Sequence, residues 1–333
     1  MNNLIYAALV GFILGFCVAL VQEFMDDRIN SPEDTRRIMN SPILGYVPMV
    51  KESDKVLLTG LANGSVFRSF SLLESYRTLR SNVQFASVDN PNISILITST
   101  TPGEGKSVTA TNLAISLALD GKSVILVDAD LRRPTIHTKF EVDSKPGLTN
   151  VLIGNMTLNQ ALKESKVPGL RLLTSGPHPP NPAELLNSQI MRRLHNELKE
   201  MADIVIFDSP PFLATADAQV LSAVTDGVLY VVQFGEAKKS AVKHSVQLLN
   251  QAHANILGVV FNKIDLSQRR DDYYYGYYGY YQYYQPAVGE GEDKRRVSTK
   301  EFEALLAMRT NLGDNPPLVE KDDSDDVSNL NKT

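Results

Sequence analysis

The sequence predicts an α/β fold in which helices cover both faces of a mostly parallel sheet. Two observations predict it: six short runs are rich in branched apolar residues, and longer segments with helical periodicity separate them. The runs are typical of strands buried on both faces, and they span residues 93–98, 123–128, 170–175, 203–208, 227–233 and 256–262. The predicted helices include residues 107–119, 183–201 and 238–252. In such a fold, right-handed crossovers bring ligands to the carboxyl ends of the strands.

The composition indicates one large domain with appendages. The chain has 333 residues, of which 43% are hydrophobic, and this is enough to bury a substantial core. Its net charge of -5 provides no overall attraction to nucleic acid, so no nucleic-acid partner is expected. The single cysteine, Cys17, cannot form an internal disulfide, which favours a reducing compartment such as the cytosol for the bulk of the protein.

An uncharged apolar segment lies near the N-terminus. Residues 4–21 contain no charged side chain and, as a helix, would extend about 27 Å, close to the hydrocarbon thickness of a bilayer. A cleaved signal peptide would need a basic start, which MNN lacks, and a buried core helix would need protein on every side. We therefore predict a transmembrane anchor at residues 1–23.

The segment that follows the anchor mixes charged residues with Pro32, Pro42 and Pro48, which limit long helices. It is interpreted as a juxtamembrane linker over residues 24–65. An amphipathic helix over residues 66–88 then opens the main domain, which is predicted to cover residues 66–265.

The chain changes character after Asp265. Residues 266–285 include a tyrosine cluster, in which nine of the twelve residues from 273 to 284 are tyrosine. Low complexity of this kind does not build a core. Residues 286–333 contain 7 basic and 11 acidic residues with few large apolar groups, which is typical of a disordered tail.

A glycine-bearing loop joins the run at residues 93–98 to the next predicted helix. Its sequence, TPGEGKS, ends in the Gly-Lys-Ser triplet of a phosphate-binding loop, although Thr100 stands where the usual pattern has its first glycine. Backbone N–H groups hold the phosphates, Lys106 reaches the β and γ oxygens, and Ser107 can ligate magnesium. The predicted nucleotide-binding residues of this loop are Thr101, Pro102, Gly103, Glu104, Gly105, Lys106, Ser107 and Val108.

Three aspartates follow predicted strands. Asp128 and Asp130 end the run SVILVDAD, for which a solvated acidic loop is the alternative, and Asp208 ends DIVIFD as a Walker B carboxylate that helps to hold magnesium. The phosphate loop and the carboxylates, in this order and at strand ends, predict nucleotide hydrolysis or phosphoryl transfer.

Four motifs resemble those of the bacterial tyrosine kinases of capsule and exopolysaccharide synthesis: TPGEGKS, LVDADLRRP, IFDSPP and LLTSGPHPPNPAELL. The N-terminal apolar run with SPEDTRR and SPILGYVP is similar to the last membrane segment and linker of that family, and the tyrosine cluster resembles its autophosphorylated tail. The resemblance implies a P-loop NTPase-type fold and a non-specific protein-tyrosine kinase that uses ATP and Mg²⁺. It also implies a single-pass protein of the bacterial plasma (inner) membrane with a cytoplasmic kinase domain.

The resemblance assigns roles to individual residues. Lys106 and Ser107 act on the phosphates and Mg²⁺, and Asp208 acts on the metal. Asp128 orients or deprotonates the attacking tyrosine and Asp130 lies nearer the metal, although these two roles can be exchanged. Asn262, at the end of a strand, is the candidate for contact with the adenine base, and a simple turn residue is the alternative.

Glu74, Arg77 and Arg80 are spaced by three residues, which places them on one face of the helix at residues 66–88. An ordinary solvated face with a local ion pair is one interpretation. The pattern resembles the E-x-x-R-x-x-R element through which the family forms rings, which implies subunit contact. In a ring, the tail of one subunit would be phosphorylated in trans by its neighbour, and the added charge would loosen the assembly.

The predicted phosphoacceptors are Tyr273, Tyr274, Tyr275, Tyr277, Tyr278, Tyr280, Tyr281, Tyr283 and Tyr284. A sticky aromatic segment that binds partners is the alternative for this cluster. The resemblance further implies regulation of polysaccharide polymerisation and export, with three partners: the export machinery, a membrane protein that supplies the chain-length-determinant domain, and a tyrosine phosphatase.

Two other functions compete with this one. A regulatory ATPase of the septum-positioning and partition type shares the variant phosphate loop, but those ATPases have a lysine where this chain has Thr101. A non-catalytic adaptor that binds nucleotide is disfavoured by the intact Lys106, Asp128, Asp130 and Asp208.

Overall fold

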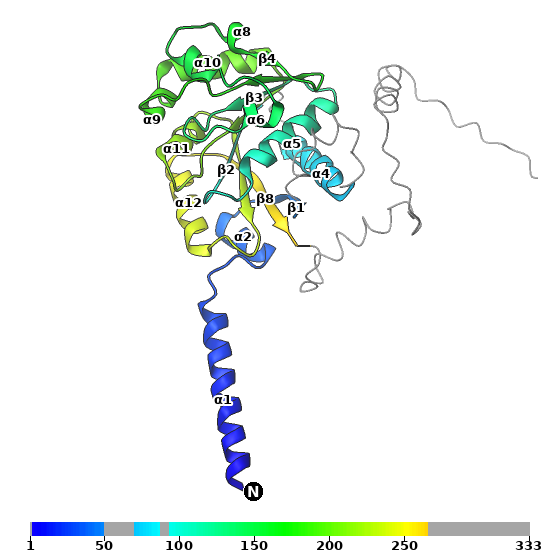
Figure 1. The fold of residues 1–333 in the computed structure, drawn as a ribbon, viewed down its shortest axis with the longest axis vertical. Coiled ribbons are helices and arrows are strands. Elements are labelled where there is room, and N and C mark those ends of the chain that lie inside the picture. Colours follow the sequence, from blue (N-terminus) through cyan, green and yellow to red (C-terminus); the bar gives the residue numbers. More distant parts are fainter. Residues whose placement is uncertain (1, 50–69, 87–92, 266–333) are drawn as a thin grey trace, which may run out of the picture.

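An eight-stranded sheet lies between two layers of helices in the computed structural model, which describes residues 2–49, 70–86 and 93–265 (Figure 1). The strand order is β1-β8-β7-β2-β6-β3-β5-β4. Neighbouring strands pair in parallel, except that β4 is antiparallel to β5. The strands are β1 (Ile43–Pro48), β2 (Ile93–Ser99), β3 (Val124–Asp128), β4 (Lys163–Glu164), β5 (Leu170–Leu173), β6 (Ile204–Asp208), β7 (Gly227–Gln233) and β8 (Ile256–Ile264). The predicted fold class is confirmed for this part of the chain.

Each face of the sheet has its own hydrophobic core. Side chains of α4 and α5 cover one face together with alternate residues of the strands, and those of α7, α10, α11 and α12 cover the other. The helices are α1 (Asn2–Met25), α2 (Pro32–Met39), α4 (Phe70–Ala86), α5 (Lys106–Leu119), α6 (Ile136–Phe140), α7 (Leu148–Leu152), α8 (Leu158–Ala161), α9 (Pro182–Leu186), α10 (Gln189–Met201), α11 (Ala216–Ser222) and α12 (Lys239–Gln251).

The six predicted strands are all present, with ends that differ by at most two residues. The helix predicted over residues 183–201 is instead two helices, α9 and α10. Ser188 separates them because its hydroxyl accepts a hydrogen bond from the N–H of Met191 at 3.1 Å and thereby caps α10.

The described part of the predicted linker, residues 26–49, is built into the domain. Ile29 is fully buried, and its N–H donates to the carbonyl of Ala237 at 2.8 Å. Ser31 caps α2, where Pro32 occupies the first turn, and β1 then adds an edge strand beside β8. Prolines are compatible with both positions, because a helix start and a sheet edge need no donor there. The remaining residues of the linker, 50–65, lie outside the described residues.

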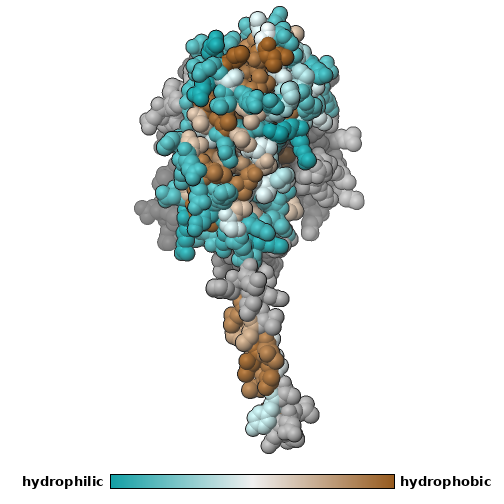
Figure 2. Space-filling model, turned by 90° about the vertical axis from the view of Figure 1, so that its left-hand side faces the viewer, coloured by the Kyte–Doolittle hydropathy of each residue, from teal (hydrophilic) through white to brown (hydrophobic). Residues whose placement is uncertain are grey.

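Helix α1 extends away from the domain (Figure 1). It exposes a set of large apolar side chains, most of them brown in Figure 2, whereas the domain face in that view is teal with separate brown patches. This set comprises Ile5, Tyr6, Leu9, Val10, Phe12, Ile13, Leu14, Phe16 and Leu20. None of the helices, as far as their residues are described, combines the length and the hydropathy needed to cross a membrane. The predicted transmembrane anchor is not confirmed.

Candidate active site

The phosphate-binding loop lies between β2 and α5, as predicted. Gly103 and Gly105 have φ angles of 89° and 98°, in the left-handed region that favours glycine. A Cβ atom on Gly105 would lie 1.9 Å from Nδ2 of Asn262, so a side chain at this position would displace Asn262. The loop therefore needs its glycines both for its backbone path and for close contact with β8.

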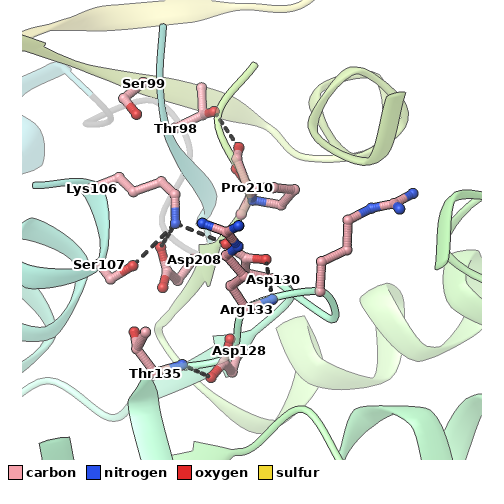
Figure 3. A network of polar contacts seen from close by, with 12 residues as sticks. Thr98, Ser99, Lys106, Ser107, Asp128, Asp130, Arg133, Thr135, Asp208 and Pro210 are labelled. Carbon is pink, nitrogen blue, oxygen red and sulfur yellow. Dashed lines mark hydrogen bonds and ion pairs between the residues drawn. The ribbon is translucent and has the colours of Figure 1, made fainter. Parts of the chain in front are cut away.

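Lys106 points across the loop toward acidic side chains (Figure 3). Its Nζ lies 3.0 Å from Oδ2 of Asp130 and 3.8 Å from Oδ1 of Asp208, and it donates to the hydroxyl of Ser107 at 3.2 Å. Burial lowers the pKa of Lys106, but the charges of Asp208 and Asp130 outweigh burial, so its net pKa is raised. The lysine is therefore held as a cation at the position where phosphate oxygens are expected.

Asp128 and Asp208 are in register at the ends of the neighbouring strands β3 and β6. Both are fully buried. Oδ2 of Asp128 accepts hydrogen bonds from the N–H groups of Thr135 and Ile136, at 3.0 and 2.9 Å, whereas its Oδ1 has no hydrogen-bond partner. Burial and the charge of Asp208 raise the pKa of Asp128 to about 8. One oxygen of Asp128 thus fixes the carboxyl group and the other is available to a ligand.

The residues predicted to hold magnesium suit that ion. Neither carboxylate oxygen of Asp208 has a hydrogen-bond partner, and Oδ1 has only the 3.8 Å ion pair with Lys106. Burial raises the pKa of Asp208, and Lys106 and the Ser107 hydroxyl oppose the shift. Among the described residues, no group of three or more His, Cys, Asp or Glu side chains forms a complete metal cage. Mg²⁺ usually needs only one or two carboxylates together with phosphate oxygens and water. The unpartnered oxygens of Asp208, with Ser107 and Asp130 nearby, fit this pattern.

Glu104 braces the phosphate-binding loop from within. Its carboxylate accepts hydrogen bonds from the N–H of Thr100 at 2.8 Å and from the hydroxyl of Thr101 at 2.9 Å. Thr100 also shares a 3.1 Å hydrogen bond with the hydroxyl of the buried Tyr230. Burial raises the pKa of Glu104 to about 7, and the hydrogen bonds from Thr101 and Thr100 oppose the shift.

The end of β8 contacts the same loop. The Asn262 amide donates to the carbonyl of Glu104 at 2.7 Å, and Lys263 Nζ donates to the carbonyl of Gly103 at 2.6 Å. Asn262 therefore supports the loop, and its predicted contact with adenine stays a prediction. Lys263 was not among the predicted site residues, although its position next to Asn262 at a strand end was the available signal.

An ion pair that the sequence did not predict lies beside the site. Arg132, which follows the acidic motif, donates two hydrogen bonds to the fully buried Asp217 of α11, at 2.8 and 3.1 Å. The hydrogen bond to Asp217 raises the pKa of Arg132. The pair connects the loop that carries Asp130 to α11. In the sequence, the LRRP motif indicated Arg132, whereas nothing indicated Asp217 as its partner.

The three charged residues predicted to contact another subunit are used differently within the chain. Glu74 pairs with Arg77, whose side chain is 53% exposed. Arg80 instead donates to the carbonyl of Ser116 at 3.2 Å and pairs with Asp120 at 3.2 Å, which fastens α4 to α5. The predicted ring contact is untested, and Arg77 is the member of the set most open to a partner.

Comparisons with known proteins assign the chain to a family. A family model described as "AAA domain" matches residues 93–258. Tyrosine-protein kinase YwqD of Bacillus subtilis (strain 168) is 48% identical over 203 residues, covering 61% of this chain and 86% of that protein. The chain belongs to the bacterial tyrosine-protein kinases. It is therefore a phosphotransferase, which decides against the partition-type ATPase and the non-catalytic adaptor.

Solved structures of this family agree with the fold. The kinase domain of the Escherichia coli tyrosine kinase ETK is 32% identical, with a TM-score of 0.66 over 73% of this chain and 98% of that one. The chimerical protein CapA2B2 is 35% identical, with a TM-score of 0.63 over 71% of this chain and all of that one. Among sequence relatives, the putative tyrosine-protein kinase EpsB of Ralstonia solanacearum is 34% identical, and the match covers 81% of this chain and 37% of that protein.

Proposed function

We propose that this kinase transfers the γ-phosphoryl group of ATP to tyrosines in its own C-terminal cluster. The observation that supports this most is the pair of buried carboxylates at the ends of β3 and β6. Their oxygens without hydrogen bonds lie at the carboxyl end of the sheet, beside Lys106. Buried polar atoms without partners are rare in folded proteins and, in a site of this kind, indicate a missing ligand. A solvated acidic loop would not bury these oxygens.

The chain's own residues would divide the reaction as follows. The loop N–H groups and Lys106 bind the phosphates and stabilise the charge that develops on the γ-phosphoryl oxygens. Asp128 accepts the phenolic proton of tyrosine on Oδ1, while the N–H groups of Thr135 and Ile136 hold Oδ2 in place. The phenolic oxygen bonds to the γ-phosphorus as the bond from phosphorus to the bridging oxygen breaks, which releases ADP.

Ser107, Asp130 and Asp208 would hold the magnesium ion that accompanies ATP. When bound, the ion neutralises charge on the phosphate oxygens. Asp130 has a second task in the protein alone, because it pairs with Lys106 and accepts the N–H of Arg133 at 2.9 Å. We expect Lys106 to exchange this carboxylate for phosphate when nucleotide binds. The reversed division of roles between Asp128 and Asp130 is less favoured, since Asp130 has these two partners.

The acceptors are the nine tyrosines from Tyr273 to Tyr284, which lie outside the described residues. Attachment to the kinase gives the cluster a high effective concentration at the active site, either of its own subunit or of a neighbour. We propose transfer in trans within a ring, with Glu74, Arg77 and Arg80 at the subunit contact. Phosphates on the tails would then loosen the ring by charge repulsion.

Helix α1 would associate with the bacterial inner membrane and keep the domain at its cytoplasmic face. The supporting observation is the set of large apolar side chains that α1 exposes, because soluble surfaces rarely leave so many of them uncovered. We also propose that phosphorylation regulates capsule or exopolysaccharide polymerisation and export. The partners would be the export machinery, a membrane protein with a chain-length-determinant domain, and a tyrosine phosphatase.

The experiment is anti-phosphotyrosine detection after incubation of the full chain, in detergent, with Mg·ATP. Three variants accompany it: Lys106→Met, a chain truncated after Asp272, and Lys166→Met as a control on an exposed ion pair with Glu141. We expect signal in the unaltered chain and the control, and none in the other two. Phosphotyrosine that survives truncation would place the acceptors elsewhere, and signal from Lys106→Met would contradict the proposed site.

A further inference from the structure

Two side chains from the end of β8 hold successive carbonyl groups of the phosphate-binding loop. Asn262 holds the carbonyl of Glu104, at 2.7 Å, and Lys263 holds that of Gly103, at 2.6 Å. In a planar trans peptide, the C=O of one residue and the N–H of the next point in opposite directions. Anchoring these two carbonyls toward β8 therefore turns the N–H groups of Glu104 and Gly105 toward the other side of the loop.

That other side is where a nucleotide phosphate would lie. Successive backbone N–H groups that converge at a helix N-terminus form an anion-binding concavity, and α5 begins at Lys106, directly after Gly105. Gly103 and Gly105 are in the left-handed region, so the free loop has other accessible conformations. A loop held in its binding conformation before the ligand arrives loses less conformational freedom on binding.

The backbone of β8 directs the Lys263 side chain toward the loop. Its φ angle is 59°, which is unusual for a residue with a side chain. The pairing of β8 with β1 explains it, because Tyr46 faces Phe261 and Pro48 faces Ile264, so one residue of β1 opposes two of β8. Such a bulge re-aims a side chain, and bulges are frequent next to active sites. Strain of this kind is kept only where the surrounding structure enforces it.

The second contact of Lys263 also fixes its direction. Nζ donates to the side-chain oxygen of Gln233 at 3.0 Å, so the amine is held between β7 and the loop. Beyond the bulge, the N–H of Met49 donates to the carbonyl of Ile264 at 2.8 Å, which secures β8 on the side of β1. The position of the amine is thus fixed by its hydrogen bonds to the loop and to β7 and by the backbone conformation of Lys263.

We propose that Lys263, together with Asn262, is a positioning residue that sets nucleotide affinity by orienting the N–H groups of Glu104 and Gly105 toward the phosphates. The inference rests on nucleotide as the ligand of this loop, as proposed above. Lys263 contacts the loop and not the reacting atoms, so its loss should raise the KM for ATP and leave kcat within about twofold. A hydrogen bond from a charged donor corresponds to a change in affinity of about tenfold or more.

The test is titration of the full chain, in detergent, with a fluorescent ADP analogue and Mg²⁺, followed by steady-state kinetics with ATP. Lys263→Met is expected to weaken nucleotide binding about tenfold, and Lys263→Arg to recover most of it. Lys263→Gly keeps the left-handed backbone without strain and removes the whole side chain, the amine included. It should bind as weakly as Lys263→Met while its unfolding midpoint is no lower than that of the unaltered chain. Lys166→Met is the matched control and should bind normally.

The outcomes separate this inference from the function it rests on. If the unaltered chain binds no nucleotide, the proposed function fails. If it binds nucleotide and Lys263→Met and Lys263→Gly bind equally well, the positioning role is wrong. Normal binding by Lys263→Gly with weak binding by Lys263→Met would assign the effect to backbone strain and would also overturn the proposal.

Discussion

The two ends of β2 both lie beside polar clusters, partly buried at the amino end and buried at the carboxyl end, and the clusters differ in how completely they are paired. At the amino end, Ser94 donates from its N–H and hydroxyl to Asp226, each at 2.8 Å, and the N–H of Asp226 donates back to that hydroxyl at 2.9 Å. Lys199 pairs with the same carboxylate at 2.7 Å, and Nε2 of His195 lies 2.7 Å from the Ser94 hydroxyl. Every member of this amino-end network has a partner.

The carboxyl end is left incomplete. There, Oδ1 of Asp128 and both oxygens of Asp208 are buried without a hydrogen bond, and Lys106 is shared between Asp130 and Asp208. A fully paired network stabilises a fold, whereas buried charge without partners destabilises it and persists where a ligand uses it. The comparison therefore assigns stability to the amino end of β2 and chemistry to its carboxyl end.

The largest effect is expected at the carboxyl end, from Asp208→Asn. Autophosphorylation should fall at least about a hundredfold, because the magnesium ion that stabilises charge in the transition state loses a ligand. Thermal stability should rise by a few degrees, since a buried charge whose oxygens accept no hydrogen bond becomes neutral while Lys106 keeps its closer ion pair with Asp130 at 3.0 Å. Phosphotyrosine detection and calorimetry on the same preparation would check both expectations. Loss of stability together with loss of activity would contradict the assignment.

A smaller effect, of the opposite kind, is expected from Asp226→Ala at the amino end. The change leaves the N–H of Ser94 without its acceptor and Lys199 without its partner, so unfolding free energy should fall by about 2–3 kcal/mol. The activity per folded molecule should be unchanged below the melting transition. Denaturant titration gives the stability, and a drop in kcat at low temperature would show that the two ends are not independent.

The smallest effect is a pH dependence centred on His195. Burial lowers the pKa of this histidine below its ordinary value of 6.5, with Asp226 opposing the shift and Lys199 adding to it. The unfolded chain therefore binds the proton more readily than the folded one. The stabilisation is complete above pH 6.5 and is lost as the pH falls from 6.5 toward the lower folded pKa, with a slope of at most about 1.4 kcal/mol per pH unit.

Unfolding midpoints measured from pH 7 to pH 5 would reveal this slope. In His195→Gln, which cannot be protonated in this range, the corresponding part of the slope should disappear. An unchanged slope in that variant would place the pH sensitivity at another group.

Much of the site could be predicted because its signals are local. The strands ending at Asp128 and Asp208 are short apolar runs bounded by an acid, and the loop before Lys106 carries its glycines in a recognisable order. Strand-end placement then brings these residues to one edge of the sheet. The residues alone predicted Lys106 and Asp208 at one site, and the family resemblance added the place of Asp130 beside them, where the structure has it.

What was missed depends on pairing between distant parts of the chain. β1 has no apolar run as long as those of the central strands, and its partner β8 is more than 200 residues away, so its place in the sheet left no local signal. The bulge that aims Lys263 at the loop follows from that pairing. The contact of Arg132 with Asp217 is likewise set by the packing of α11 and not by spacing.

The most direct test of the contrast between the two ends is thermal unfolding of the full chain, in detergent, with and without Mg·ADP, compared with Asp208→Asn and Asp226→Ala. We predict that Mg·ADP raises the midpoint of the unaltered chain and of Asp226→Ala by a similar amount, and that Asp208→Asn, although more stable alone, loses the magnesium-dependent part of the shift. An undiminished magnesium-dependent shift in Asp208→Asn would show that this carboxylate does not help to bind Mg·ADP, and it would contradict the assignment of chemistry to the carboxyl end.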